Sequence, residues 1–200
     1  MASYAENYSN NSAVTTLGGG AKDEEPDILV NHVATVDLKV PTCQESKDHY
    51  DHRSGKKVYH YCTSLIGELK PAPSRSLKGV DHAFEVGFGL KAAETDLLEY
   101  CAAYFECHPN AKSVIALAAA GPFWKWALIN PKHVPEWNWI LNEPADPKGY
   151  RVTSWSKRFS EEYFILGTER SDKELTKINE QHIYRMLIDG HTPDVPISLR

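Results

Sequence analysis

The chain has 200 residues, of which 22 are Lys or Arg and 27 are Asp or Glu, so its net charge is −5 with neutral histidines. This length suits one domain with tails, and the acidic balance argues against strong non-specific nucleic-acid binding, which depends on lysine and arginine. No segment approaches the ~20 consecutive apolar residues that span a bilayer, so we expect no contact with a membrane.

The location of the protein is indicated by its N-terminus and its cysteines. The N-terminus lacks the basic stretch and apolar core of a secretory signal. The four cysteines form no Cys-x-x-Cys pair; they are Cys43, Cys62, Cys101 and Cys107. Free thiols in a reducing compartment are the default for such a chain. We therefore expect an intracellular protein, either cytoplasmic or nuclear.

The composition divides the chain into three parts. Residues 1–23 are rich in Ser, Asn, Thr, Ala and Gly and end in three consecutive glycines, which is typical of a flexible arm. Residues 24–189 carry the apolar periodicity of a single folded domain, and residues 190–200 form a proline-containing tail.

The domain begins with a predicted strand and a loop. Residues 27–40 are rich in β-branched side chains, which favours a strand with a candidate break at Asn31-His32. Residues 41–55 are polar and end in Ser-Gly, a pattern typical of a turn or hairpin loop.

A strand, a helix and a hairpin follow. Residues 56–70 form a strand-like run that Pro71 ends. Apolar residues at helical spacing predict a helix over 90–106, and the continuous apolar run 113–120 predicts a buried strand. Residues 123–129 are typical of its hairpin partner.

The last predicted elements are a loop, a short strand and a helix. Residues 130–150 predict an ordered surface loop, and residues 164–166 predict a strand. Ser171 and Glu174 have the spacing of a capping box, which predicts a helix from Ser171 to about residue 188. The element order therefore predicts an α/β (α+β) fold with a central mixed sheet flanked by helices.

Three charged side chains form a candidate catalytic site. Glu68 and Lys70 are two residues apart at the end of a predicted strand, so they share one face of the sheet. Asp27 follows Pro26 at the start of an earlier strand. Carboxylates suit Mg²⁺, which can acidify a bound water, and a lysine can orient that water and stabilise developing negative charge. This combination predicts a metal-dependent phosphodiesterase site.

A second stretch of sequence copies the pattern. Asp37-Leu38-Lys39 also closes a β-branched run, and pairing it with Asp27 would require a tight hairpin at Asn31-His32. We prefer Glu68 and Lys70 as the second motif, and the alternative of Asp37 and Lys39 stays open at this point.

These motifs resemble a known superfamily. Pro26-Asp27, followed by Glu68-Leu69-Lys70, a helix and the strand 113–120, is similar to the PD-(D/E)xK nucleases, which have the restriction-endonuclease-like fold. The segments 110–126 and 167–175 also resemble uncharacterised fungal proteins of this type, for which no activity is established.

The resemblance implies a function and a set of roles. Asp27 and Glu68 would bind Mg²⁺ or Mn²⁺, Lys70 would serve the attacking water, and the substrate would be DNA or RNA. Glu94 is the implied polar residue on the helix that follows the second motif. The superfamily usually has a helix with another acid before the first motif, whereas Glu6 is the only acid before Asp23 here. This departure keeps open a catalytically inactive binding module on the same fold.

A cluster of histidines and cysteines offers a different chemistry. Cys43, His49, His52, His60 and Cys62 are close in sequence, and zinc takes Cys and His ligands. His60 and Cys62 on one strand are the only pair with usable geometry. We prefer the interpretation of a solvated loop beside half-buried aromatic and thiol groups.

Four tryptophans could stack nucleobases. Trp124 and Trp126 share one face of a predicted strand, which favours packing against a helix. Trp137 and Trp139 lie in the predicted loop, where a binding role is more plausible.

Overall fold

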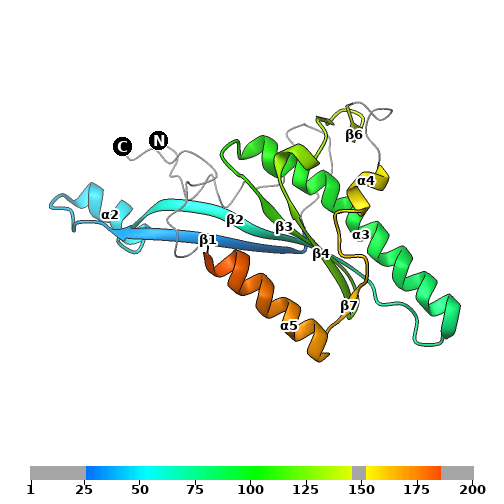
Figure 1. The fold of residues 1–200 in the computed structure, drawn as a ribbon. Helices are drawn as coiled ribbons and strands as arrows, with labels where there is room; N and C mark the ends of the chain where they lie inside the picture. The colour runs from blue at the N-terminus through cyan, green and yellow to red at the C-terminus, as the bar shows by residue number, and fades with distance from the viewer. Residues whose placement is uncertain (1–25, 146–151, 186–200) are drawn as a thin grey trace.

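The computed structural model describes residues 26–145 and 152–185 (Figure 1). The predicted arm 1–23 and tail 190–200 lie outside these residues. Across the described ranges, no helix combines the length and apolar character needed to cross a membrane. The elements in chain order are β1 (Ile28–Asp37), α2 (Gln44–His52), β2 (Lys56–Lys70), α3 (Gly79–Cys107), β3 (Val114–Ala120), β4 (Phe123–Ile129), η1 (Pro131–His133), β5 (Trp137–Asn138), β6 (Glu143–Pro144), α4 (Val152–Ser156), β7 (Phe164–Ile165), α5 (Glu169–Ile178) and η2 (Asn179–Ile183).

The main sheet has five strands in the order β1-β2-β3-β4-β7. β2 and β3 are parallel, and the other neighbouring pairs are antiparallel. A parallel pair requires a crossover connection, which α3 supplies. β1 and β2 extend beyond the rest of the sheet as a long ribbon that carries α2 near its tip (Figure 1). The predicted mixed sheet with packed helices is thus confirmed.

The central strand β3 is buried on both faces because both of its alternating sets of side chains are apolar. Ala116 and Ala118 pack in one cluster with Leu97 of α3, whereas Ile115 packs in another with Ile178 at the end of α5. α3 and α5 therefore cover opposite faces of the sheet. Burial on both faces explains why an alanine-rich segment forms a strand here.

The helix α3 begins eleven residues before the predicted start at residue 90, at Gly79. The sequence does not predict this first part because it contains Gly87 and Gly89, and glycine is a poor helix former. A Cβ atom added at Gly89 would lie 2.9 Å from the Cβ of Ala120, so glycine lets α3 lie close to β3. Tertiary packing thus stabilises a helical segment that local propensity disfavours.

Two predictions about the β1-β2 ribbon are wrong. The segment 41–55 is not only a loop, because good helix formers such as glutamine, glutamate and lysine build α2 within it. The turn at its end is confirmed, with φ of 49° at Ser54 and 67° at Gly55. β1 is not broken at Asn31-His32, although the register with β2 shifts between Val30 and Asn31.

The prediction of a capping box that begins at Ser171 is also wrong. α5 begins at Glu169, and the side chain of Thr168 caps it by accepting a hydrogen bond from the backbone N–H of Ser171 at 3.3 Å. Ser171 is buried inside the first turn, where its Oγ accepts a hydrogen bond from Trp124 Nε1 at 3.1 Å. The predicted loop 130–150 contains η1 and the small β5-β6 sheet, and its last residues lie outside the described ranges.

Candidate active site

The register of β1 against β2 brings the two acidic motifs together. Ile28 pairs with Gly67, so Asp27 lies beside the end of β2. The backbone N–H of Leu69 donates to Asp27 Oδ2 at 2.8 Å, which fixes the Asp27 carboxylate next to the Glu68-Leu69-Lys70 segment. Asp27, which is distant in the sequence from Glu68 and Lys70, therefore lies beside them at one end of the ribbon.

The ammonium of Lys70 joins two carboxylates. Its Nζ donates to Glu68 Oε1 at 2.7 Å and to Asp96 Oδ2. Asp96 lies on α3, which packs against β2 and β3. Asp96, rather than Glu94, is thus the helix residue that contacts Lys70. Glu94 is buried and forms an ion pair with Lys91, with 3.6 Å between the charged atoms.

Glu68 is a buried acid with an incomplete set of hydrogen bonds. The residue is 6% exposed, and its Oε2 has no hydrogen-bond partner among the described residues. Burial raises the pKa of Glu68; the hydrogen bond and charge of Lys70 lower it, while the nearby Asp27 and Asp96 raise it further. A buried carboxylate oxygen without a partner is costly, and an added cation would relieve that cost.

The pKa values of Glu68 and Lys70 are both raised, and the two shifts have opposite consequences for the ion pair. Burial alone would lower the pKa of Lys70, but its hydrogen bonds to Asp96 and Glu68 raise that pKa to about 12. The shift of Lys70 favours the charged pair, whereas the shift of Glu68 opposes it. We take Lys70 to be charged at neutral pH, because two carboxylates surround it, and we attribute the shift of Glu68 to its own desolvation.

The competing motif Asp37-Leu38-Lys39 lies at the other end of the ribbon. Asp37 pairs with Lys56 in register, and Lys56 Nζ lies 2.9 Å from Asp37 Oδ1. Ten residues of continuous strand separate Asp27 from Asp37, a span of about 33 Å. The tight hairpin that would unite them does not form, so the alternative motif is wrong as a partner for Asp27.

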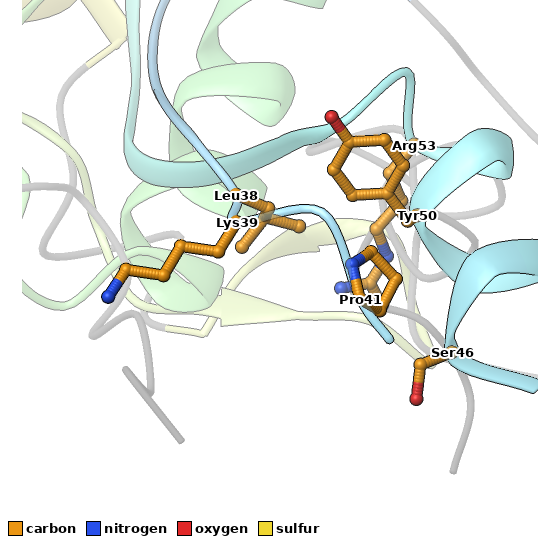
Figure 2. A pocket seen from close by; sticks show the side chains of 6 residues that line it. All are labelled: Leu38, Lys39, Pro41, Ser46, Tyr50 and Arg53. Carbon is orange, nitrogen blue, oxygen red and sulfur yellow. The ribbon is translucent and has the colours of Figure 1, made fainter. Parts of the chain in front are cut away.

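A surface pocket near α2 is separate from the candidate site. Figure 2 shows its lining residues, which come from the segment after β1 and from α2 and the turn that follows it; they are Leu38, Lys39, Pro41, Ser46, Tyr50 and Arg53. This pocket includes Lys39 of the competing motif and none of the side chains around Glu68.

The acidic residues fit a hard divalent cation. Asp27 and Glu68 supply the oxygen ligands that Mg²⁺ prefers, and Mg²⁺ keeps several waters when few carboxylates bind it. Glu68 Oε2, which has no hydrogen-bond partner in the described part of the chain, suits such a ligand role. A cation bound by Asp27 and Glu68 Oε2 would lie beside Lys70, because the Lys70 ammonium forms an ion pair with Glu68 Oε1.

Another group has closer ligand spacing. The potential ligand atoms of His32, His60 and Cys62 all lie within 4.8 Å of one another. Among the residues that the structure describes, no other set of three His, Cys, Asp or Glu side chains has this spacing. The sequence indicates the pair His60 and Cys62 but not His32. The signal that could identify His32 is the antiparallel register, which places it opposite Cys62.

The tryptophans are engaged in packing and hydrogen bonding. Trp124 bonds to Ser171, and Trp126 Nε1 donates to Glu174 Oε1 at 3.0 Å, so both contact α5. Trp139 Nε1 donates to Glu106 Oε2 at 2.7 Å, and the ring centroids of Trp137 and Trp139 are 6.0 Å apart. The predicted packing role of Trp124 and Trp126 is confirmed.

No family model, curated protein or solved structure matches the chain.

Proposed function

We propose that the protein is a metal-dependent phosphodiester hydrolase of the nuclease type that acts on nucleic acid, with a restriction-endonuclease-like fold. The observation that carries the proposal is the meeting of Asp27, Glu68 and Lys70 at one end of the β1-β2 ribbon, with the buried Glu68 Oε2 unpartnered among the described residues. The order of β1, β2, α3 and β3 around this site also agrees with the resemblance to PD-(D/E)xK nucleases.

The roles follow from the chemistry of the side chains. Asp27 and Glu68 would hold Mg²⁺ or Mn²⁺, which when bound would polarise the phosphate and acidify a water. Lys70, kept charged by its neighbours, would orient the attacking water and stabilise negative charge on the phosphate. Asp96 would position the Lys70 ammonium from α3 through their hydrogen bond.

A second candidate function is a catalytically inactive binding module on the same framework. Lys70 already forms ion pairs with both Glu68 and Asp96, so its ammonium is held within a closed network. The net charge of −5 also disfavours tight binding of a polyanion.

Cleavage assays separate the two candidates. The full chain is incubated with labelled single- and double-stranded DNA and RNA, with Mg²⁺, Mn²⁺ or EDTA. We expect metal-dependent cleavage that falls at least about 100-fold in Glu68→Gln and Lys70→Ala, because loss of a group that stabilises the transition state has effects of this size.

The chain offers a matched control. Asp37→Asn and Lys39→Ala change the corresponding acid and lysine of the copied motif at the other end of the ribbon, and we expect both to retain cleavage. Equal loss in the control variants, or cleavage that survives both site substitutions, would contradict the assigned site. No cleavage together with no Mg²⁺ or Mn²⁺ binding by calorimetry would favour the inactive module.

A further inference from the structure

The middle of the β1-β2 ribbon brings together three side chains with metal-binding chemistry. His32 is the register partner of Cys62, and residues directly opposite one another in an antiparallel pair point to the same face. His60 precedes Cys62 by two residues on β2, so it shares that face as well. Two strands thus contribute three nitrogen and sulfur ligands to one location.

The distances match those that a tetrahedral ion imposes. His60 Nε2 lies 3.3 Å from Cys62 Sγ, and His32 Nδ1 lies 3.8 Å from the same sulfur. Around a tetrahedral zinc ion, bonds of ~2.1 Å to nitrogen and ~2.3 Å to sulfur place these two atoms about 3.6 Å apart. The two observed separations lie on either side of that value, so small side-chain rotations would complete the geometry.

The backbone around these residues is unusual. The register of the ribbon shifts between Val30 and Asn31 and again between Ala34 and Thr35, so the ligand-bearing pairs lie in a short regular segment between two irregularities. Beside the first shift, Ser64 Oγ donates to the carbonyl oxygen of Val30 at 2.9 Å. Bulges of this kind re-aim side chains and are frequent next to functional sites.

Burial gives the group a protected side and an accessible side. Cys62 is 1% exposed and His60 is 6% exposed, whereas His32 is partly exposed. A buried thiolate favours zinc and similar ions over Mg²⁺, because soft and borderline ions select sulfur and imidazole ligands. Because His32 is partly exposed, a metal ion would reach the group from its side, and a water would serve as the fourth ligand.

We propose that His32, His60 and Cys62 form a binding site for a divalent transition-metal ion, with zinc the best match to the ligand set. The site differs in residues, ligand chemistry and position from the acidic site around Glu68, and it does not depend on the proposed hydrolase activity. Because its ligands come from both strands, the bound ion would clamp β1 to β2 where their pairing is irregular.

Metal titrations test the proposal on the full chain after removal of bound metal with a chelator. Zn²⁺ affinity is measured by competition with a chelating dye, and Co²⁺ is used as a spectroscopic probe. We expect one ion per chain, a thiolate-to-cobalt charge-transfer band, and the intense visible bands of a tetrahedral cobalt site. Absence of the charge-transfer band in the unaltered protein would overturn the proposal.

Two variants test the ligands, and a third serves as a control. Cys62→Ser should lose the charge-transfer band, and His32→Gln should bind Zn²⁺ at least about tenfold more weakly, since even supporting residues of metal sites have effects of this size. Cys43→Ser, which removes an exposed thiol elsewhere, should keep both properties. Circular dichroism checks the fold of each variant, and His32→Gln decides the matter if Cys62→Ser misfolds. An unchanged affinity in His32→Gln, or a band lost in Cys43→Ser, would refute the site.

Discussion

The contact between α3 and β3 can be tested with two glycines of the same helix. Gly87 and Gly89 both lie in α3, where replacement of glycine by alanine normally stabilises a helix by about 1 kcal/mol. A Cβ atom at Gly87 would meet nothing within 4 Å. At Gly89 it would lie 2.9 Å from the Cβ of Ala120, an atom that no side-chain rotation can move.

The two substitutions should therefore have different effects on stability. Gly87→Ala should gain the helix term alone, about 1 kcal/mol, which raises the melting temperature of a chain this size by about 2–4 °C. Gly89→Ala gains the same term but incurs the overpacking cost of about 1–3 kcal/mol, so its net effect ranges from neutral to about 2 kcal/mol destabilising. The difference between the variants isolates the steric term.

Urea unfolding followed by circular dichroism measures both values. Equal stabilisation by the two substitutions would refute the close approach of α3 to β3. The result also bears on the site, because Gly89 and Asp96 are seven residues apart and share one face of α3. Displacement of that face in Gly89→Ala should weaken the bond from Lys70 to Asp96 and lower any cleavage activity, whereas Gly87→Ala should leave cleavage unchanged.

Three other predictions concern single side chains. The folded-state pKa of Glu68 is raised above its ordinary value of 4.5, mainly by burial, so ionisation of Glu68 lowers the stability of the protein as the pH rises above 4.5. The unfolding free energy of Glu68→Gln should therefore increase relative to that of the unaltered protein as the pH rises above 4.5, and urea titrations at several pH values check this. Asp96→Asn should lower the pKa of Lys70 from about 12, as a Lys70 side-chain NMR titration would show, and a constant pKa would contradict the ion pair. Ser171→Ala should destabilise the protein by about 1–3 kcal/mol because it leaves the buried Trp124 Nε1 without its partner, while the exposed Ser74→Ala should change stability little in the same urea assay.

The sheet could be predicted from the sequence because its strands have strong local signals. Residues 56–70 match β2, and the apolar run 113–120 matches β3 to within one residue. α2 was missed because it has no apolar face to reveal it. The first part of α3 was missed because Gly89 is explained only by the closeness of Ala120, which is distant in the sequence.

The candidate site shows the same division between local and long-range information. Asp27, Glu68 and Lys70 could be predicted because strand ends and the period of two place them. Asp96 could not be predicted, because its contact with Lys70 depends on the packing of α3. His32 could not be predicted either, because its position opposite Cys62 depends on the register of β1 against β2. That register includes two shifts, and a shift of one residue would move His32 to the opposite face from Cys62.

The two candidate sites lie on one strand and are still physically separate. His60 and Glu68 are eight residues apart on β2, which corresponds to about 26 Å of extended chain. At that distance, substitutions without shared partners act independently. Loss of Zn²⁺ binding in His32→Gln should therefore leave Mg²⁺-dependent cleavage unchanged, and Glu68→Gln should leave Zn²⁺ affinity unchanged. Coupling in either direction would mean that the ribbon transmits strain between the sites, most directly through the irregular pairing at Val30 and Asn31 that lies between them.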